Sequence, residues 1–182
     1  MNNTFGIPII PDNDATRVQK LHEYQILDTP VGEGPFQHVA SLATHLFKVP
    51  IALVSLVDKQ RVWFKANVGL EGVNEVDRGT SLCSLAVLSH EPTVFENAVE
   101  EPCLLANPLV AGEFGLRFYA AAPLTNPEGL NLGAVCIVDK IPRKFSIADQ
   151  KILEHLAAVV MKELELWKLT IPAQQKAVNA NV

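Results

Sequence analysis

Three cysteines carry the most reactive side chains of this sequence, and they lie far apart, at Cys83, Cys103 and Cys136. Cys83 stands in an expected short helix over residues 81–89, and a thiol near a helix N-terminus can have a lowered pKa and act as a nucleophile. The alternative is that Cys83 is a small buried hydrophobe. Because the three cysteines are odd in number and widely spaced, they predict neither a disulfide framework nor a metal pair. A reducing, cytoplasmic location is the expectation.

The five histidines give no metal-binding pattern. Only His38 and His45 lie at helical spacing, two turns apart, and no carboxylate stands between them at a ligand position. We expect solvated or capping roles for these side chains. The sequence therefore predicts no metal and no cofactor.

Aromatic side chains offer the walls of an apolar pocket, and Trp63, Phe118 and Tyr119 are the candidates. The alternative is that they pack the core, which we expect for Phe64 and Phe95. Successive strand residues face opposite sides of a sheet, so only one of Phe118 and Tyr119 can point into a cavity.

Two polar residues are candidates for contacts with a ligand in such a pocket. Arg117 is the best candidate anchor for an anionic ligand, and Asn107 is a second polar contact. The alternative for Arg117 is an ordinary ion pair with Glu113 or Asp139.

Two expected β-hairpins must position these groups. The continuously apolar run 51–57 indicates a strand covered on both faces, and the alternating run 61–68 indicates a more exposed partner. In that partner, Val62, Phe64 and Ala66 should share one side, opposite Trp63.

The second hairpin joins the runs 117–124 and 131–139 across a cluster of Pro, Gly and Asn residues. These runs are crowded with Ala and Gly, which leaves room for a close helix or a bound molecule. Cys136 lies inside the second run, and a short strand is expected over 93–95.

Three helices are expected around the hairpins. Asp14 is the predicted cap of a helix over residues 15–27, and a second helix should run from about Glu33 to Pro50. Ser146 and Asp149 form a capping-box pattern that begins the last helix, and Pro172 should end it.

The last helix is too apolar for a surface helix with one buried face, because eleven of the sixteen residues 152–167 are apolar. We therefore predict a homodimer interface formed by Leu153, Leu156, Val160, Leu164 and Trp167. The alternative is that the first helix covers the same stripe within one chain, through Val18, Leu21 and Tyr24.

The 182 residues fit one domain, with 48% hydrophobic and 19% charged residues. We expect an extended arm over 1–13, a domain over 14–168 and a flexible tail over 169–182. The net charge is −5 and the basic residues form no run, which argues against nucleic-acid binding. No apolar stretch reaches about 20 residues, so no membrane span is expected.

With its elements in this order, the chain resembles the GAF domain family of small sensory modules. The segments that carry the resemblance span nearly the whole chain and are residues 24–30 (YQILDTP), 49–58 (VPIALVSLVD), 63–65 (WFK), 107–110 (NPLV), 116–120 (LRFYA), 122–124 (APL) and 132–139 (LGAVCIVD).

The resemblance implies an α+β fold. A central antiparallel sheet of five or six strands should carry the N- and C-terminal helices on one face, and a long connection should enclose a ligand pocket on the other. The implied ligand-binding residues are Trp63, Cys83, Leu85, Asn107, Arg117, Phe118, Tyr119 and Cys136.

Three functions are compatible with the resemblance. The first is a small-molecule sensor that signals through helix packing to a separate partner, such as a histidine kinase or a cyclase. The second is a thiol-dependent enzyme similar to the free methionine-(R)-sulfoxide reductases, with Cys83 as nucleophile and the position of the resolving cysteine departing from their pattern. The third is a degenerate module that only binds a protein partner.

The cysteine segment separates this chain from some relatives. Signalling relatives most often show Phe-Cys-Ala-His where this sequence has Leu82, Cys83, Ser84 and Leu85. No cysteine is followed by histidine, which argues against a bilin-attachment site. The Asn-Lys-Phe-Asp-Glu signature of cyclic-nucleotide-binding relatives is absent from the sequence as well.

Overall fold

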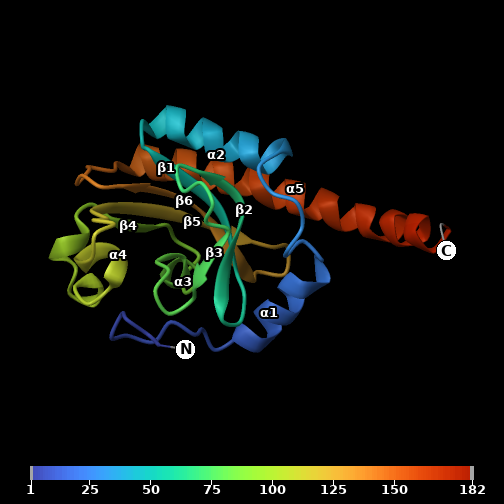
Figure 1. Ribbon diagram of the computed structural model, residues 1–182, viewed down its shortest axis with the longest axis horizontal. Helices are drawn as coiled ribbons and strands as arrows, with labels where there is room; N and C mark the ends of the chain where they lie inside the picture. The colour runs from blue at the N-terminus through green and yellow to red at the C-terminus, as the bar shows by residue number, and fades with distance from the viewer. Residues whose placement is uncertain (1, 181–182) are drawn as a thin grey trace.

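A six-stranded antiparallel sheet forms the centre of the protein, in a computed structural model that describes residues 2–180 and the side chains of residues 2–171 (Figure 1). The strand order is β3-β2-β1-β6-β5-β4. The strands are β1 (Ile51–Val57), β2 (Arg61–Val68), β3 (Glu75–Asp77), β4 (Thr93–Phe95), β5 (Phe118–Thr125) and β6 (Asn131–Asp139). The predicted fold class, both hairpins and the short strand β4 are confirmed. The three-residue strand β3 lies in the long connection, at a place where the sequence predicted no strand.

The hairpin of β1 and β2 contains a β-bulge. Val54 faces Ala66 across the two strands, whereas the next residue, Ser55, faces Phe64. Lys65 is therefore an extra residue without a partner on β1, and such an insertion reverses the alternation of side chains along the strand.

The bulge moves residues of β2 to the face opposite the expected one. Val62 and Phe64 belong to the core on one face, while Trp63 and Ala66 belong to the core on the other. The prediction that Ala66 shares a side with Phe64 is wrong for this reason. The prediction that β2 is more exposed than β1 is confirmed, because every residue of β1 is buried whereas Arg61, Asn67 and Val68 of β2 are half-buried. The side of β2 expected to be exposed is nevertheless buried at Trp63 and Lys65.

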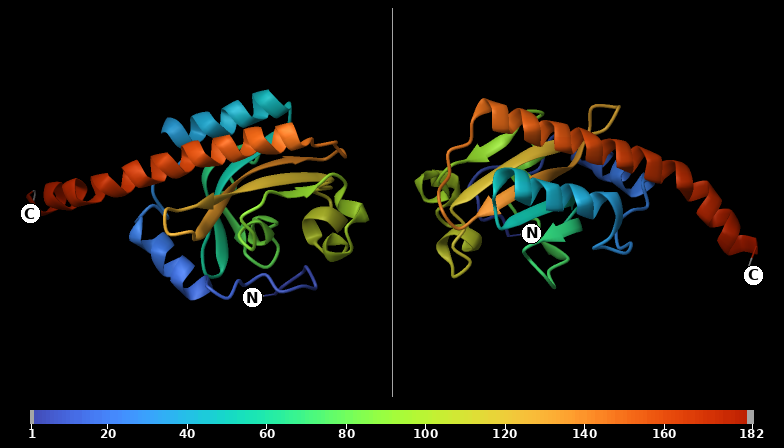
Figure 2. Two further views of the ribbon diagram at one scale, coloured as in Figure 1. Left: turned by 180° about the vertical axis from the view of Figure 1, so that it is seen from behind. Right: turned by 90° about the horizontal axis from the view of Figure 1, so that it is seen from above.

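Helices α2 (Gly34–Phe47) and α5 (Ile147–Ala180) lie side by side on one face of the sheet (Figures 1 and 2). The predicted capping box is confirmed, since the amide of Asp149 donates to Ser146 Oγ (3.1 Å) and the amide of Ser146 to Asp149 Oδ2 (2.9 Å). The predicted stop at Pro172 is wrong, because α5 continues to Ala180. The flexibility of residues 169–182 stays a prediction, and residues 181–182 lie outside the described part.

The five residues predicted to form a dimer interface pack within the chain instead. Leu153, Leu156, Val160 and Leu164 are buried in the core between α5, α2 and the sheet. Trp167 packs against the same core, and its Nε1 donates to the carbonyl of Tyr24 (3.0 Å). The sheet thus covers the apolar side of α5 that was predicted to bind a second copy of the chain.

Helix α1 (Asp14–Glu23) lies beside the turn between β1 and β2 (Figure 1), and its last residue, Glu23, pairs with Lys168 on α5 (3.7 Å). Asp14 makes ion pairs rather than the predicted cap. Its Oδ1 accepts from Arg17 Nε (3.0 Å) and Arg78 Nη2 (2.7 Å), and both guanidinium groups are fully buried. Burial raises the pKa of Asp14, but the hydrogen bonds from Arg78 and Arg17 outweigh it and lower the pKa below its ordinary value.

The other face of the sheet is covered by irregular chain with four short helices, α3 (Cys83–Ala86), η1 (Ala98–Glu100), η2 (Pro102–Leu104) and α4 (Pro108–Ala111). The N-terminal arm lies across this cover, with Phe5 and Ile9 buried in its core. No helix among the described residues is long and apolar enough to cross a membrane.

Candidate functional site

A cavity of about 230 Å³ lies between the sheet and its irregular cover. Five strands form its floor, through Leu53, Phe64, Val76, Tyr119, Cys136 and Val138. The cover contributes Leu70, Val73, Ser81, Leu82, Cys83, Leu109, Phe114 and Leu116. No lining side chain is charged, so the cavity suits a small uncharged molecule better than an ion.

Two thiols meet at the floor of this cavity. The Cys83 Sγ lies 3.5 Å from the Cys136 Sγ, and the hydroxyl of Tyr119 donates to the Cys83 Sγ at 3.4 Å. Cys136 and Tyr119 are held on the neighbouring strands β6 and β5, whereas Cys83 is brought from α3 in the cover. Residues 53 positions apart in the sequence thus form one polar cluster in an apolar cavity.

The pKa values of the three groups in this cluster shift in different directions. Hydrogen bonding from Cys136, Ser55 and Tyr119 lowers the pKa of the Cys83 thiol, although burial acts in the opposite direction. The neighbouring Cys83 raises the pKa of Cys136, and burial adds to the increase. Burial also raises the pKa of Tyr119. The two thiols therefore titrate as a pair, and the hydrogen bonds of the cluster converge on the Cys83 sulfur.

The structure places the eight predicted ligand-binding residues differently. Cys83, Tyr119 and Cys136 line the cavity together. Leu85 is buried in the same core but outside the lining. Trp63 and Phe118 belong to the core on the opposite face, so the prediction that they line the pocket is wrong.

Asn107 joins parts of the cover instead of lining the cavity. Its Nδ2 donates to Thr4 Oγ1 (3.0 Å) and to the carbonyl of Thr80 (2.9 Å), and its Oδ1 accepts from the amide of Leu109 (3.0 Å). One buried amide therefore connects the N-terminal arm, the segment before Cys83 and the start of α4.

Arg117 also lies outside the cavity. Its Nη1 donates to the carbonyls of Val110 (3.1 Å) and Leu116 (2.8 Å). Asp139, one of the expected partners, pairs with Arg143 instead (2.6 Å to Nε). The guanidinium thus joins α4 to the residue before β5. The prediction that Arg117 anchors a ligand in the pocket is wrong.

Phe64 lines the cavity, whereas the sequence predicted only a core position for it. It forms part of the floor beside Leu53. The signal was its alternation with Val62 along β2, which placed it on the face away from Trp63. Leu109, on the four-residue helix α4, and Phe114, in the irregular chain after it, carry no such signal, because the path of this part of the cover depends on distant contacts.

Behind Phe64, the bulge residue Lys65 lies buried on the helix-covered face. Its Nζ donates to Thr29 Oγ1 (2.9 Å) and to the carbonyl of Pro30 (2.7 Å). Burial lowers its pKa. Three aromatic rings surround the ammonium group, with centroids 5.0 Å away in Trp167, 5.6 Å in Phe36 and 5.9 Å in Trp63.

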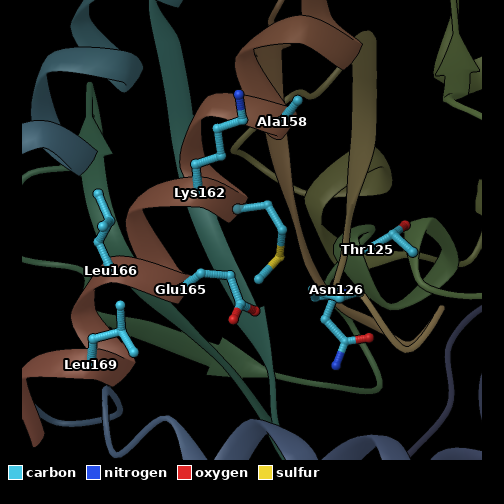
Figure 3. Close-up of a pocket in the computed structure, with 9 residues that line it drawn as sticks. Thr125, Asn126, Ala158, Lys162, Glu165, Leu166 and Leu169 are labelled. Atoms are coloured by element: carbon cyan, nitrogen blue, oxygen red, sulfur yellow. The ribbon is translucent and has the colours of Figure 1, made fainter.

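A second hollow is an open groove between α5 and the turn that joins β5 to β6 (Figure 3). Leu166 and Leu169 on α5 are exposed beside it, and Thr125 and Asn126 form the opposite wall. The lining is predominantly apolar. This groove is more open to the surface than the cavity, and it belongs to the helix that extends beyond the sheet.

Comparisons with known proteins agree with this architecture. The family model described as GAF domain matches residues 33–164. A cyclic di-GMP phosphodiesterase of Pseudomonas aeruginosa is 36% identical over 167 residues, which cover 91% of this chain and 28% of that protein. The chain thus spans less than a third of this relative.

Solved structures show the same fold at low sequence identity. The GAF domain of an Acinetobacter phosphoenolpyruvate-protein phosphotransferase superposes with a TM-score of 0.62 at 18% identity, covering 86% of this chain and 95% of that one. A free methionine-R-sulfoxide reductase from Neisseria meningitidis, solved with its substrate, also gives 0.62 at 18% identity, covering 92% and 98%.

Proposed function

Because this chain belongs to the GAF domain family, we propose that it is a cytoplasmic regulatory module whose cavity binds a small uncharged molecule and whose helix α5 carries the response. The observation that supports this most directly is the apolar cavity of about 230 Å³ on one face of a sheet that holds α5 on the other. A ligand that orders the cover would shift the population of conformations without breaking a bond.

The β-bulge supplies the route from the cavity to α5 in this proposal. Phe64 lines the cavity, and the next residue, Lys65, contacts the ring of Trp167 on α5. A ligand that displaces Phe64 moves the bulge, and Lys65 transmits that movement to the helix. The two sides of the sheet are linked here by adjacent residues of one strand.

The proposed output is an enzyme of cyclic-di-GMP turnover, as the name of the Pseudomonas relative suggests. The cavity itself does not suit cyclic di-GMP, because that ligand carries two phosphate charges and the lining offers none of the opposite sign. The module in this proposal therefore regulates such an enzyme in response to a different molecule.

The proposed module pairs with a second copy through the exposed side of α5. Ile152, Val159 and Leu166 are exposed at seven-residue steps, and Leu169 follows three residues later. This is the a/d spacing of a helix that packs against another helix. The groove beside Leu166 in Figure 3 continues the same apolar surface.

Ligand binding is tested with indole and benzyl alcohol as uncharged probes and benzoate as the charged counterpart, by isothermal calorimetry and thermal shift. We expect the uncharged probes to bind and benzoate not to bind. Val73→Trp fills the mouth of the cavity and should abolish binding, while Val99→Trp, at a similarly exposed site outside the lining, should not. Equal binding by the two variants would refute the cavity as the site.

Pairing is tested by analytical ultracentrifugation of two matched variants. Leu166 and Leu105 are both 56% exposed, but only Leu166 lies on the proposed surface. Leu166→Glu should convert the dimer to a monomer, and Leu105→Glu should leave the dimer unchanged. A monomeric native chain at tens of micromolar would remove pairing from the proposal.

The closeness of Cys83 and Cys136 favours a thiol-dependent reductase as a second candidate function, because it supplies the resolving thiol that the sequence pattern lacked. The uncharged lining argues against free methionine sulfoxide as the substrate, since a zwitterion needs charged partners. Turnover of methionine sulfoxide with a dithiol reductant distinguishes the two candidates, and we expect none.

A further inference from the structure

From the cysteine pair, we infer that the cavity holds a redox-active dithiol, Cys83 and Cys136, that a small uncharged hydroperoxide oxidises to an intramolecular disulfide. This inference goes beyond the proposed ligand-binding function and does not depend on it. It rests on the geometry of three groups that share one enclosed space.

The two thiols lie within reach of each other. The two sulfur atoms are 3.5 Å apart, which is van der Waals contact, and a disulfide bond is about 2.05 Å long. Bond formation thus requires an approach of about 1.5 Å. Cys136 lies in the middle of the sheet, whereas Cys83 belongs to a four-residue helix in the irregular cover, so Cys83 is the sulfur free to move.

The chemical character of the cavity matches one class of oxidant. Its walls are apolar, and its polar groups gather at one point, where the two thiols meet the hydroxyl of Tyr119. An alkyl hydroperoxide has the matching shape, with an apolar tail and one polar end. Oxidised glutathione is too large and too highly charged for about 230 Å³ of uncharged space.

The reaction balances with one hydroperoxide per pair of thiols. The Cys83 thiolate attacks the terminal peroxide oxygen, the O–O bond breaks, and Cys83 becomes a sulfenic acid while the alkoxide takes up a proton to leave as an alcohol. The Cys136 sulfur then attacks the Cys83 sulfur, and the hydroxyl leaves as water with the Cys136 proton. Both cysteines are oxidised by one electron each, and the peroxide is reduced by two.

The three groups have separate roles in this reaction. Cys83 is the attacking thiol, in agreement with its lowered pKa, and Cys136 resolves the sulfenic acid. Tyr119 stays protonated and lies within hydrogen-bond reach of the attacking sulfur. Its hydroxyl is therefore placed to donate to the departing alkoxide.

Cys103 is an internal control, because it is half-buried, lies outside the cavity lining and has a pKa raised by burial. The reduced protein is treated with tert-butyl hydroperoxide, quenched with iodoacetamide and digested for peptide mapping. We expect a peptide that joins Cys83 to Cys136, an alkylated Cys103, and a fall from three titratable thiols to one. Dithiothreitol should restore all three.

The variants separate the roles. Cys103→Ser keeps both cavity thiols and should give the same disulfide, which keeps the test valid even if a cavity variant fails to fold. Cys136→Ser should accumulate a sulfenic acid on Cys83 that dimedone traps, and Tyr119→Phe should slow oxidation at least tenfold. Oxidised glutathione should react at least a hundredfold more slowly than the hydroperoxide.

Three results would overturn the inference. They are oxidation of Cys103 alone, disulfides that join different chains, and a Cys136→Ser protein that dimedone does not label at Cys83. Each of these outcomes leaves the binding of indole or benzyl alcohol untouched, so failure of the dithiol and failure of the proposed ligand site are distinguishable.

Discussion

On the face of the sheet that α2 and α5 cover, apolar side chains such as Leu153 and Val160 make most of the contacts, whereas on the other face buried polar side chains hold the cover. The cover is fixed by Arg78, by Asn107 and by Asn131, whose Nδ2 donates to the carbonyls of Val87 (3.2 Å) and Ser89 (2.9 Å).

The difference follows from the backbone of each cover. A helix satisfies its own amide and carbonyl groups, so it needs only an apolar stripe to bind the sheet. Irregular chain has no repeating partners for these groups, and side chains must supply them. A cover held by a few separate polar side chains leaves space between these contacts, and the cavity beside Cys83 lies in that space.

The largest expected effect comes from breaking the ion pairs that hold the start of the cover. Asp14→Ala leaves the buried guanidinium groups of Arg17 and Arg78 without their carboxylate, and we expect a loss of about 3–5 kcal/mol in the free energy of unfolding. Asp12→Ala, at an exposed neighbouring carboxylate, should change it by less than about 0.5 kcal/mol. Urea unfolding at neutral pH measures both.

The same pair of variants predicts an acid dependence. The folded state lowers the pKa of Asp14 below its ordinary value of 3.8, so the carboxylate contributes stability above that pH and loses it as the pH falls through the folded-state pKa. The difference between the native protein and Asp14→Ala should therefore shrink below about pH 3.8. A difference that stays constant there would show that Asp14 acts through packing alone.

The next effect compares a leucine from each face. Leu153 on α5 is fully buried in the helix-covered core, and Leu153→Ala should cost about 2–5 kcal/mol because it leaves a void in close packing. Leu109 on the cavity wall is half-buried and already borders empty space, so Leu109→Ala should cost at most about 1 kcal/mol. Equal costs would mean that the two faces are packed alike.

Local sequence patterns located both hairpins and the start of the last helix, but they identified neither the side of that helix that meets the sheet nor the cavity. The hairpins and the capping box at Ser146 are local patterns, and the structure has them where they were predicted. On α5, eleven apolar residues among sixteen occupy more than one side of the helix, so periodicity alone did not say which side meets the sheet. The predicted interface therefore fell on residues that pack against the sheet.

Long-range contacts account for what the sequence did not reveal about the site. The bulge at Lys65 reverses the faces of β2 by one residue, which no local alternation shows. Asp14 and Arg78 are 64 positions apart and Cys83 and Cys136 are 53 apart, and both pairs depend on how irregular chain crosses the sheet. Such partners become visible only when the topology is known.

A smaller effect is expected from Asn107, the buried polar side chain that joins parts of the cover. Asn107→Ala removes the donors to Thr4 and Thr80, and the loss of buried hydrogen bonds should cost about 1–3 kcal/mol. Hydrogen exchange should speed up at the amides of 107–111, while the amides of α5 keep their protection until global unfolding. Asn74→Ala, on an exposed side chain, is the control. If exchange throughout α5 became faster by more than the measured loss of global stability accounts for, the two faces would not be held separately.

The smallest effect concerns Lys65, the buried charge on the otherwise apolar helix-covered face. Burial lowers its pKa below the ordinary 10.5, so between the folded-state pKa and 10.5 the unfolded chain holds more protons and stability rises with pH. Lys65→Met cannot donate to the carbonyl of Pro30 and should lose about 1 kcal/mol at neutral pH. It also loses the titrating group, so its deficit relative to the native protein should widen as the pH approaches 10.5.

Unfolding of both proteins in urea from about pH 7 to about pH 10 measures that widening, with Lys59→Met, at an exposed lysine, as the matched control. A constant deficit across this range would mean that the ammonium group is as well solvated in the folded chain as in the unfolded one. The three aromatic rings and two oxygen acceptors would then replace water fully, and the helix-covered face would accept a buried charge as readily as the loop-covered face does at Arg78.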